Sequence, residues 1–131
     1  GGTFGGNPLS CVAALKAVEI VQQLLGDVQK LGAVLMNRLR EMYDKYEMIG
    51  DIRGIGLMAG VELVKDRKTK EPAREERDKI MNECHKNGLI VIGAGAYHNV
   101  IRFLPPLNIG EELLNKGLDI LEAATKAAST K

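Results

Sequence analysis

The sequence predicts an α/β (α+β) fold in which a small sheet of three to four strands is covered by helices. Two patterns predict it: long segments with apolar residues every three to four positions, and short segments with apolar residues at every second position. They follow one another in the order helix, helix, strand, helix, strand, strand, helix. The 131 residues suit one ordinary core, which must be aliphatic because only 4% of the residues are aromatic.

The first third of the chain has helical spacing. Pro8 suits the first turn of a helix, with Asn7 as the cap before it, and the apolar residues then repeat up to Leu25. Gly26 is expected to interrupt this helix and Asp27 to cap a second one. The second helix keeps its apolar residues three to four positions apart, at Val28, Leu31, Leu35, Leu39 and Met42.

The rest of the chain alternates between short apolar segments and helical ones. Glycine and proline residues separate them, as is usual at the ends of helices and strands. The predicted elements are a strand at 57–64, a charged turn at 65–70, a helix from Pro72 to Lys86, strands at 89–92 and 99–104, and a helix after Gly110.

Composition argues against several classes of function. Eighteen basic and seventeen acidic residues leave a net charge of +1, so no basic field exists to attract nucleic acid or an anionic membrane. No apolar run approaches the roughly 18–20 residues that span a bilayer. Cys11 and Cys84 do not form a disulfide framework, which favours a cytoplasmic location, and His85 and His98 lack metal-ligand spacing.

The glycine-rich segment Gly1 to Pro8 is the first candidate site. Glycines allow positive φ angles and a close backbone approach to a ligand. Together with the Thr3 hydroxyl and the start of a helix, they make a phosphate site plausible. The alternative is a flexible terminal loop, since the segment matches neither a Walker A loop nor a dinucleotide fingerprint.

Arg102 is the second candidate, because it stands inside an otherwise apolar strand. A guanidinium there must point away from the core or be paired, and its planar fork suits a carboxylate. The alternative is a structural salt bridge. Glu62 is expected to face solvent or to be salt-bridged, and Arg53 to be structural, with a loop arginine near a ligand as the alternative.

Three segments resemble motifs of the class III (ornithine/4-aminobutyrate type) aminotransferases, which use pyridoxal phosphate. They are residues 2–9 (GTFGGNPL), 53–63 (RGIGLMAGVEL) and 99–107 (NVIRFLPPL), in the family's order. The resemblance implies that residues 1–25 are the end of a large domain, with the cofactor-phosphate loop and a linking helix. Residues 26–131 would be the C-terminal small domain of a fold-type I enzyme.

The resemblance also implies roles for two residues. Thr3 matches the threonine whose hydroxyl contacts the cofactor phosphate in the partner subunit's site, which implies a homodimer or higher homo-oligomer. Arg102 matches the arginine that binds the substrate carboxylate. The family's cofactor-linked lysine lies upstream of Gly1, so this chain is expected to be a piece of an enzyme, with no catalytic residue and no activity of its own.

Substrates follow from the same resemblance. Residues 96–100 (AYHNV) resemble 4-aminobutyrate aminotransferases, which implies transfer of an amino group from 4-aminobutyrate or a similar ω-amino acid to a 2-oxo acid. The alternatives are an amino-acid racemase or an acetylornithine/ornithine aminotransferase of the same family, or a non-catalytic domain. We expect no metal, nucleic acid or membrane as a partner.

Overall fold

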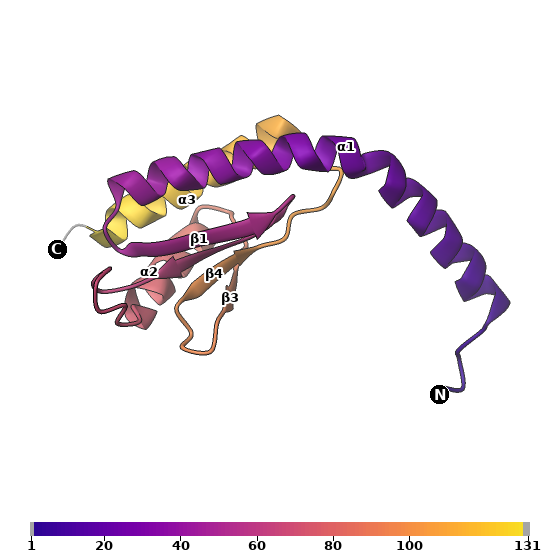
Figure 1. Ribbon diagram of the computed structural model, residues 1–131, viewed down its shortest axis with the longest axis horizontal. Coiled ribbons are helices and arrows are strands. Elements are labelled where there is room, and N and C mark those ends of the chain that lie inside the picture. Colours follow the sequence, from indigo (N-terminus) through magenta and orange to yellow (C-terminus); the bar gives the residue numbers. More distant parts are fainter. Residues whose placement is uncertain (1, 130–131) are drawn as a thin grey trace.

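The computed structural model describes residues 2–129, which form three helices and one four-stranded antiparallel sheet (Figure 1). This confirms the predicted α/β class. The elements are α1 Pro8–Lys45, β1 Ile49–Ile55, β2 Met58–Leu63, α2 Arg74–Lys86, β3 Ile92–Ala94, β4 Val100–Phe103 and α3 Glu111–Ser129.

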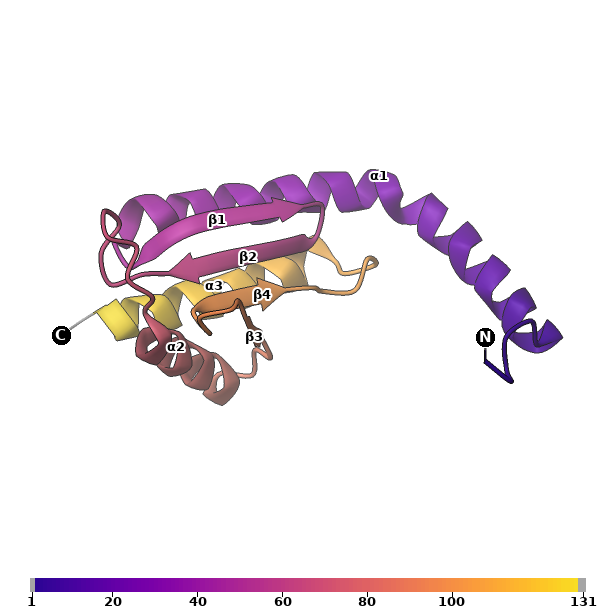
Figure 2. The same cartoon turned by 60° about the horizontal axis from the view of Figure 1, so that its bottom comes forward.

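The sheet has the strand order β1-β2-β4-β3, with every neighbouring pair antiparallel. Side chains alternate between its two faces, so Ala59, Val61 and Leu63 of β2 are buried while Gly60 and Glu62 point the other way. In Figure 2 the sheet lies in front of α1 and α3, and within residues 2–129 no helix covers its front face. The sheet therefore has one buried face and one open face.

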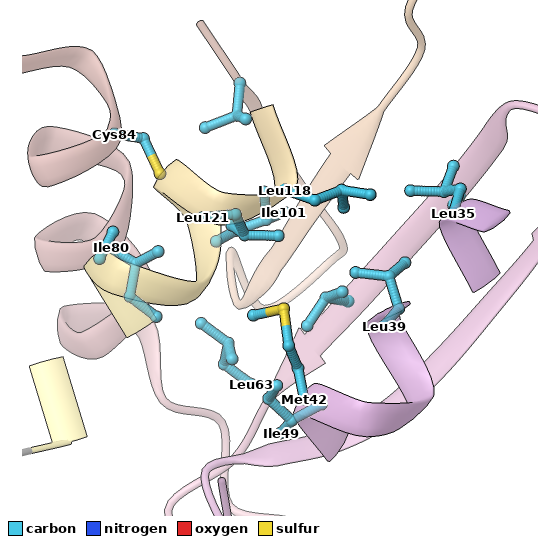
Figure 3. Close-up of a cluster of buried hydrophobic side chains, with 14 of the residues drawn as sticks. Leu35, Leu39, Met42, Ile49, Leu63, Ile80, Cys84, Ile101, Leu118 and Leu121 are labelled. Atoms are coloured by element: carbon cyan, nitrogen blue, oxygen red, sulfur yellow. The ribbon is translucent and has the colours of Figure 1, made fainter. Parts of the chain in front are cut away.

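The core lies between the buried face of the sheet and the three helices, and Figure 3 shows its side chains converging there. It is aliphatic, as predicted. Its largest fully buried side chains come from all three helices and from three of the strands or their ends: Leu35, Leu39, Met42, Ile49, Leu63, Ile80, Cys84, Ile101 and Leu121.

The predicted break between two helices at Gly26 is wrong. Helix α1 is one continuous helix of 38 residues, and Asp27 caps nothing there. A glycine inside a helix costs only about 1 kcal/mol relative to alanine, which the packed second half of α1 outweighs. The N-terminal cap is as expected, because the Asn7 side chain accepts a hydrogen bond from the Ser10 amide at 3.2 Å.

Strand β1 was missed by the sequence analysis. Asp51 and Arg53 face away from the core, and Gly50 and Gly54 occupy two further positions, so the strand shows little apolar alternation. It exists because it pairs with β2 over most of its length. Two boundaries also differ. Strand β3 begins at Ile92 rather than ending there, and α2 begins at Arg74 rather than Pro72.

The first half of α1 projects from the domain. Residues 8–23 are all exposed, and both views show this part extending away from the sheet (Figures 1 and 2). Contrary to the sequence-based expectation, α1 has the length and apolar composition of a membrane-crossing helix, and none of the apolar window is buried. The apolar side chains here need a cover that residues 2–129 do not supply.

The second half of α1 crosses the β1–β2 turn at close range. A Cβ added to Gly32 would lie 2.7 Å from the backbone of Gly56, which itself has a positive φ of 54°. Only glycine on the helix permits this approach. In contrast, a Cβ at Gly26 would meet nothing within 4 Å.

The two glycines of α1 are therefore expected to respond oppositely to alanine. Gly26→Ala should raise the free energy of unfolding by about 1 kcal/mol through helix propensity. Gly32→Ala should lower it by about 1–3 kcal/mol, because the new methyl group collides with backbone. Urea denaturation followed by circular dichroism measures both, and equal effects of the two substitutions would contradict the close crossing.

The two cysteines should differ in reactivity. Cys84 is fully buried, and burial, followed by the charge of Glu83, raises the pKa of its thiol to about 11. Cys11 is exposed on α1. Since the thiolate is the reactive form, Cys11 of the isolated chain should react quickly with Ellman's reagent at pH 8, and Cys84 only after denaturation. Cys11→Ser should abolish the fast phase; a remaining fast phase would show that Cys84 is accessible.

Candidate functional site

Arg102 lies on the open face of the sheet. It sits in β4 directly opposite Gly60 of β2 on one side and Ile92 of β3 on the other. Its neighbour Ile101 faces the core, so strand alternation points the guanidinium outward, as one of the sequence-based alternatives predicted. Among residues 2–129, no hydrogen bond or ion pair engages it.

Arg53 lies in the same cross-strand row, on the far side of Gly60. Its Nη1 donates to Asp51 Oδ2 at 2.5 Å and lies 2.8 Å from Glu62 Oε2. These carboxylates, Asp51 first and then Glu62, hold the pKa of Arg53 above its ordinary value. Glu62 is thus salt-bridged, as expected, and Arg53 is structural within this sheet rather than free for a ligand.

The open face therefore has an uneven distribution of charge. Two carboxylates neutralise Arg53, whereas the guanidinium of Arg102 keeps its charge and its donors available. A guanidinium with free donors binds a carboxylate in a bidentate manner. The arrangement suits an anionic group that approaches Arg102 and is repelled by Asp51 and Glu62 at the other end of the row.

An apolar groove of about 600 Å³ adjoins Arg102. It lies between α3 and the segments around β3 and β4, and its lining includes Ile92, Leu104, Pro105 and Leu113. The exposed position of several of these large apolar side chains makes this a second surface that residues 2–129 leave uncovered.

The Thr3 turn lies at the other end of the molecule. Thr3 is exposed in a turn in which the Gly5 amide donates to the Gly2 carbonyl at 3.1 Å, and Gly6 has a positive φ of 79°. Helix α1 begins directly afterwards, and no acidic residue in its first turn offsets the positive end of its dipole. A hydroxyl, a glycine turn and a helix N-terminus are groups that fit a phosphate.

The structure does not bring Thr3 and Arg102 together. Both views place the N-terminal end of α1, which directly follows the Thr3 turn, away from the sheet that contains β4 (Figures 1 and 2). Residues 8–25 alone span about 27 Å at the usual helical rise. One copy of the chain thus presents two separate groups, one suited to a phosphate and one suited to a carboxylate.

Gly60 is the site residue that sequence reasoning did not single out. Its signal was present in the alternation of residues 59–63, where small or polar residues separate apolar ones. Its position between two arginines, however, depends on pairing with strands that lie elsewhere in the sequence. Residues 2–129 contain no group of three or more His, Cys, Asp or Glu side chains that could hold a metal ion.

Comparison with known proteins connects these groups to a family. The family model described as "Aminotransferase class-III" matches residues 1–125. The chain is 41% identical over 129 residues to a probable 4-aminobutyrate aminotransferase of Bacillus subtilis, covering 97% of this chain and 30% of that protein. It is 48% identical over 124 residues to a leucine/methionine racemase of Thermococcus litoralis, covering 93% of this chain and 28% of that protein.

Solved structures agree in fold. A Bacillus anthracis aminotransferase is similar with a TM-score of 0.87 at 36% identity, over 95% of this chain and 29% of that one. The chain thus spans about 30% of the length of the relatives that it matches. With the family model matching almost its whole length, the chain belongs to the class III aminotransferases, which are pyridoxal-phosphate-dependent enzymes.

Proposed function

We propose that this chain is the C-terminal part of an aminotransferase that moves an amino group from 4-aminobutyrate or a similar ω-amino acid to a 2-oxo acid. The observation that carries the proposal is the unengaged guanidinium of Arg102 on the open face of the sheet. Two relatives named 4-aminobutyrate aminotransferase or probable 4-aminobutyrate aminotransferase, and one named 5-aminovalerate aminotransferase, support this donor class.

Thr3 and Arg102 have distinct roles in the proposed reaction. When bound, pyridoxal phosphate supplies an electron sink and carries the amino group between substrates. The Thr3 hydroxyl and the glycine turn hold its phosphate in the partner subunit's site, which makes the intact enzyme a homodimer or a higher homo-oligomer. Arg102 binds a substrate carboxylate and so orients the substrate toward the reacting centre.

The chain by itself should be inactive, because none of its lysines matches the family's cofactor-linked lysine. Borohydride reduction of the isolated chain with pyridoxal phosphate should therefore leave no stoichiometric cofactor–lysine adduct. We also propose that residues 1–25 belong to the large domain and 26–131 to the small domain. The exposure of α1 up to Gln23 supports this division.

The remainder of the enzyme is proposed to cover the projecting half of α1. The similar solved structure includes 95% of this chain, which supports a protein cover rather than a bilayer. A cytoplasmic enzyme follows from the reduced state expected of Cys11 and Cys84.

A racemase of the same family is the second candidate, favoured by the 48% identity to a leucine/methionine racemase. Product analysis of the full-length enzyme separates the two. Transfer predicts a semialdehyde or keto acid from the donor and an equal amount of new amino acid from the 2-oxo acid. Formation of a D-amino acid without net transfer would overturn the aminotransferase proposal.

Arg102→Lys in the full-length enzyme should raise KM for carboxylate substrates. Loss of the bidentate fork is expected to weaken carboxylate binding by about 1–3 kcal/mol, or roughly 5- to 150-fold. Steady-state kinetics with 4-aminobutyrate and with the 2-oxo acid measure this effect. Unchanged kinetics would remove Arg102 from the substrate site.

Thr3→Ala should weaken retention of the cofactor, because the phosphate loses a hydroxyl donor. A loss of about 0.5–1.5 kcal/mol, up to roughly tenfold in Kd, is expected for one hydrogen bond. Equilibrium dialysis of the full-length enzyme against pyridoxal phosphate measures it, with Thr3→Ser as the variant that keeps the hydroxyl. Equal affinities of the alanine and serine variants would contradict the assignment.

A further inference from the structure

Asn99 is one of two polar residues that are buried among residues 2–129, and the other is Thr125. It directly precedes β4 and lies three residues before Arg102. Its side-chain Nδ2 donates to the carbonyl of Leu63, at the end of β2, at 2.8 Å. Because a polar group that leaves water costs free energy unless it is hydrogen-bonded, this bond compensates for the burial of the amide.

The Asn99 amide completes the last rung of the β2–β4 ladder. Two residues that face each other in a hydrogen-bonded antiparallel pair exchange two N–H···O bonds. The Leu63 backbone amide donates to the Asn99 carbonyl at 2.8 Å, and the Asn99 side chain supplies the bond in the opposite direction. The Leu63 carbonyl also accepts the Ala73 amide at 3.1 Å, so one oxygen joins β4, β2 and the segment before α2.

This rung fixes which residues of β4 face which residues of β2. Asn99 opposite Leu63 continues the register that sets Gly60 against Arg102. Strand β4 has only four residues, so few backbone bonds hold it. A shift by one residue would exchange the two faces of the strand and turn Arg102 toward the core. Backbone groups can pair in any register, whereas the bond from the Asn99 side chain forms in only one.

The turn before Asn99 is strained. His98 has a positive φ of 54°, which is uncommon for a residue other than glycine, and its amide donates to the carbonyl of Gly95 at 3.0 Å. Such conformations persist only where the surrounding contacts hold them. The two bonds between Asn99 and Leu63 lie directly after this turn, and they therefore anchor the start of β4 against its strain.

We propose that Asn99 is a positioning residue for Arg102, because its buried amide locks the β2–β4 register and so holds the guanidinium where it binds a substrate carboxylate. This rests on the proposed function. The bond is buried among residues of this chain, so it does not depend on what covers the sheet in the full-length enzyme. Without the amide, only a fraction of the molecules keeps Arg102 in its binding position, and the apparent affinity falls by that fraction.

A double-mutant cycle in the full-length holoenzyme tests the proposal. Arg102→Ala first identifies the substrate, 4-aminobutyrate or 2-oxoglutarate, whose KM depends on Arg102. Asn99→Ala should raise this KM about three- to tenfold and leave kcat within about twofold, because saturating substrate selects the binding arrangement. In the Arg102→Ala background, Asn99→Ala should change kcat/KM for the same substrate by less than about twofold, since residues that act through one another are not additive.

Thr125→Val serves as the matched control. Thr125 is as buried as Asn99, and its hydroxyl donates to the Leu121 carbonyl at 2.8 Å within α3 rather than between strands. This substitution also removes a buried hydrogen bond and should lower Tm, yet KM for the Arg102-dependent substrate should stay unchanged. An equal rise of KM in the Thr125 and Asn99 variants would identify general destabilisation as the cause and would overturn the positioning role.

Asn99→Ser provides a second, milder variant. Its hydroxyl keeps a polar atom in the buried site but lies one bond closer to the backbone than the amide nitrogen, so it restores the bond to Leu63 only in part. KM should therefore lie between the values of the wild type and of Asn99→Ala. If Asn99→Ala does not fold, the cycle with Arg102→Ala is decided by Asn99→Ser.

The outcomes separate the two proposals. A wild-type enzyme that transfers no amino group, or an Arg102→Ala variant with unchanged KM for both substrates, would overturn the proposed function and this inference with it. A wild-type enzyme whose KM depends on Arg102, with Asn99 variants that have no effect or the same effect in both backgrounds, would overturn this inference alone.

Discussion

The antiparallel pairing of β2 with β4 is the constraint on which the rest of the structure depends. It sets Val61 against Ile101 on the buried face and Gly60 against Arg102 on the open face. A slip of one residue would turn the guanidinium of Arg102 into an aliphatic core, where an unpaired charge is strongly unfavourable. The burial that stabilises the domain and the presentation of its free cation thus follow from one register.

Helix α1 has a packed half and an exposed half. Its second half packs on the β1–β2 turn, where Gly32 and Gly56 allow the backbones to meet closely. Its first half carries the Thr3 turn away from the sheet with its apolar side chains uncovered. This geometry explains why one copy of the chain holds groups suited to a phosphate and a carboxylate without bringing them together.

Charge pairing on the open face distinguishes Arg53 from Arg102. Arg53 is bound by Asp51 on its own strand and by Glu62 on the next, so its charge is satisfied locally. Arg102 has Gly60 and Ile92 as its cross-strand neighbours, and neither offers an acceptor side chain. The availability of a guanidinium is therefore decided by the residues on adjacent strands.

Local pattern was enough to predict the aliphatic core and most helices, and to single out Arg102 as a charge in an apolar strand that must face outward or be paired, because periodicity and charge act over a few residues. It was not enough for strand β1, for the continuity of α1 through Gly26, or for Gly60 beside Arg102. Those features depend on partners distant in the sequence: β2 completes β1, packing on the sheet outweighs the weak helix propensity of a glycine, and β4 returns to β2 some forty residues later.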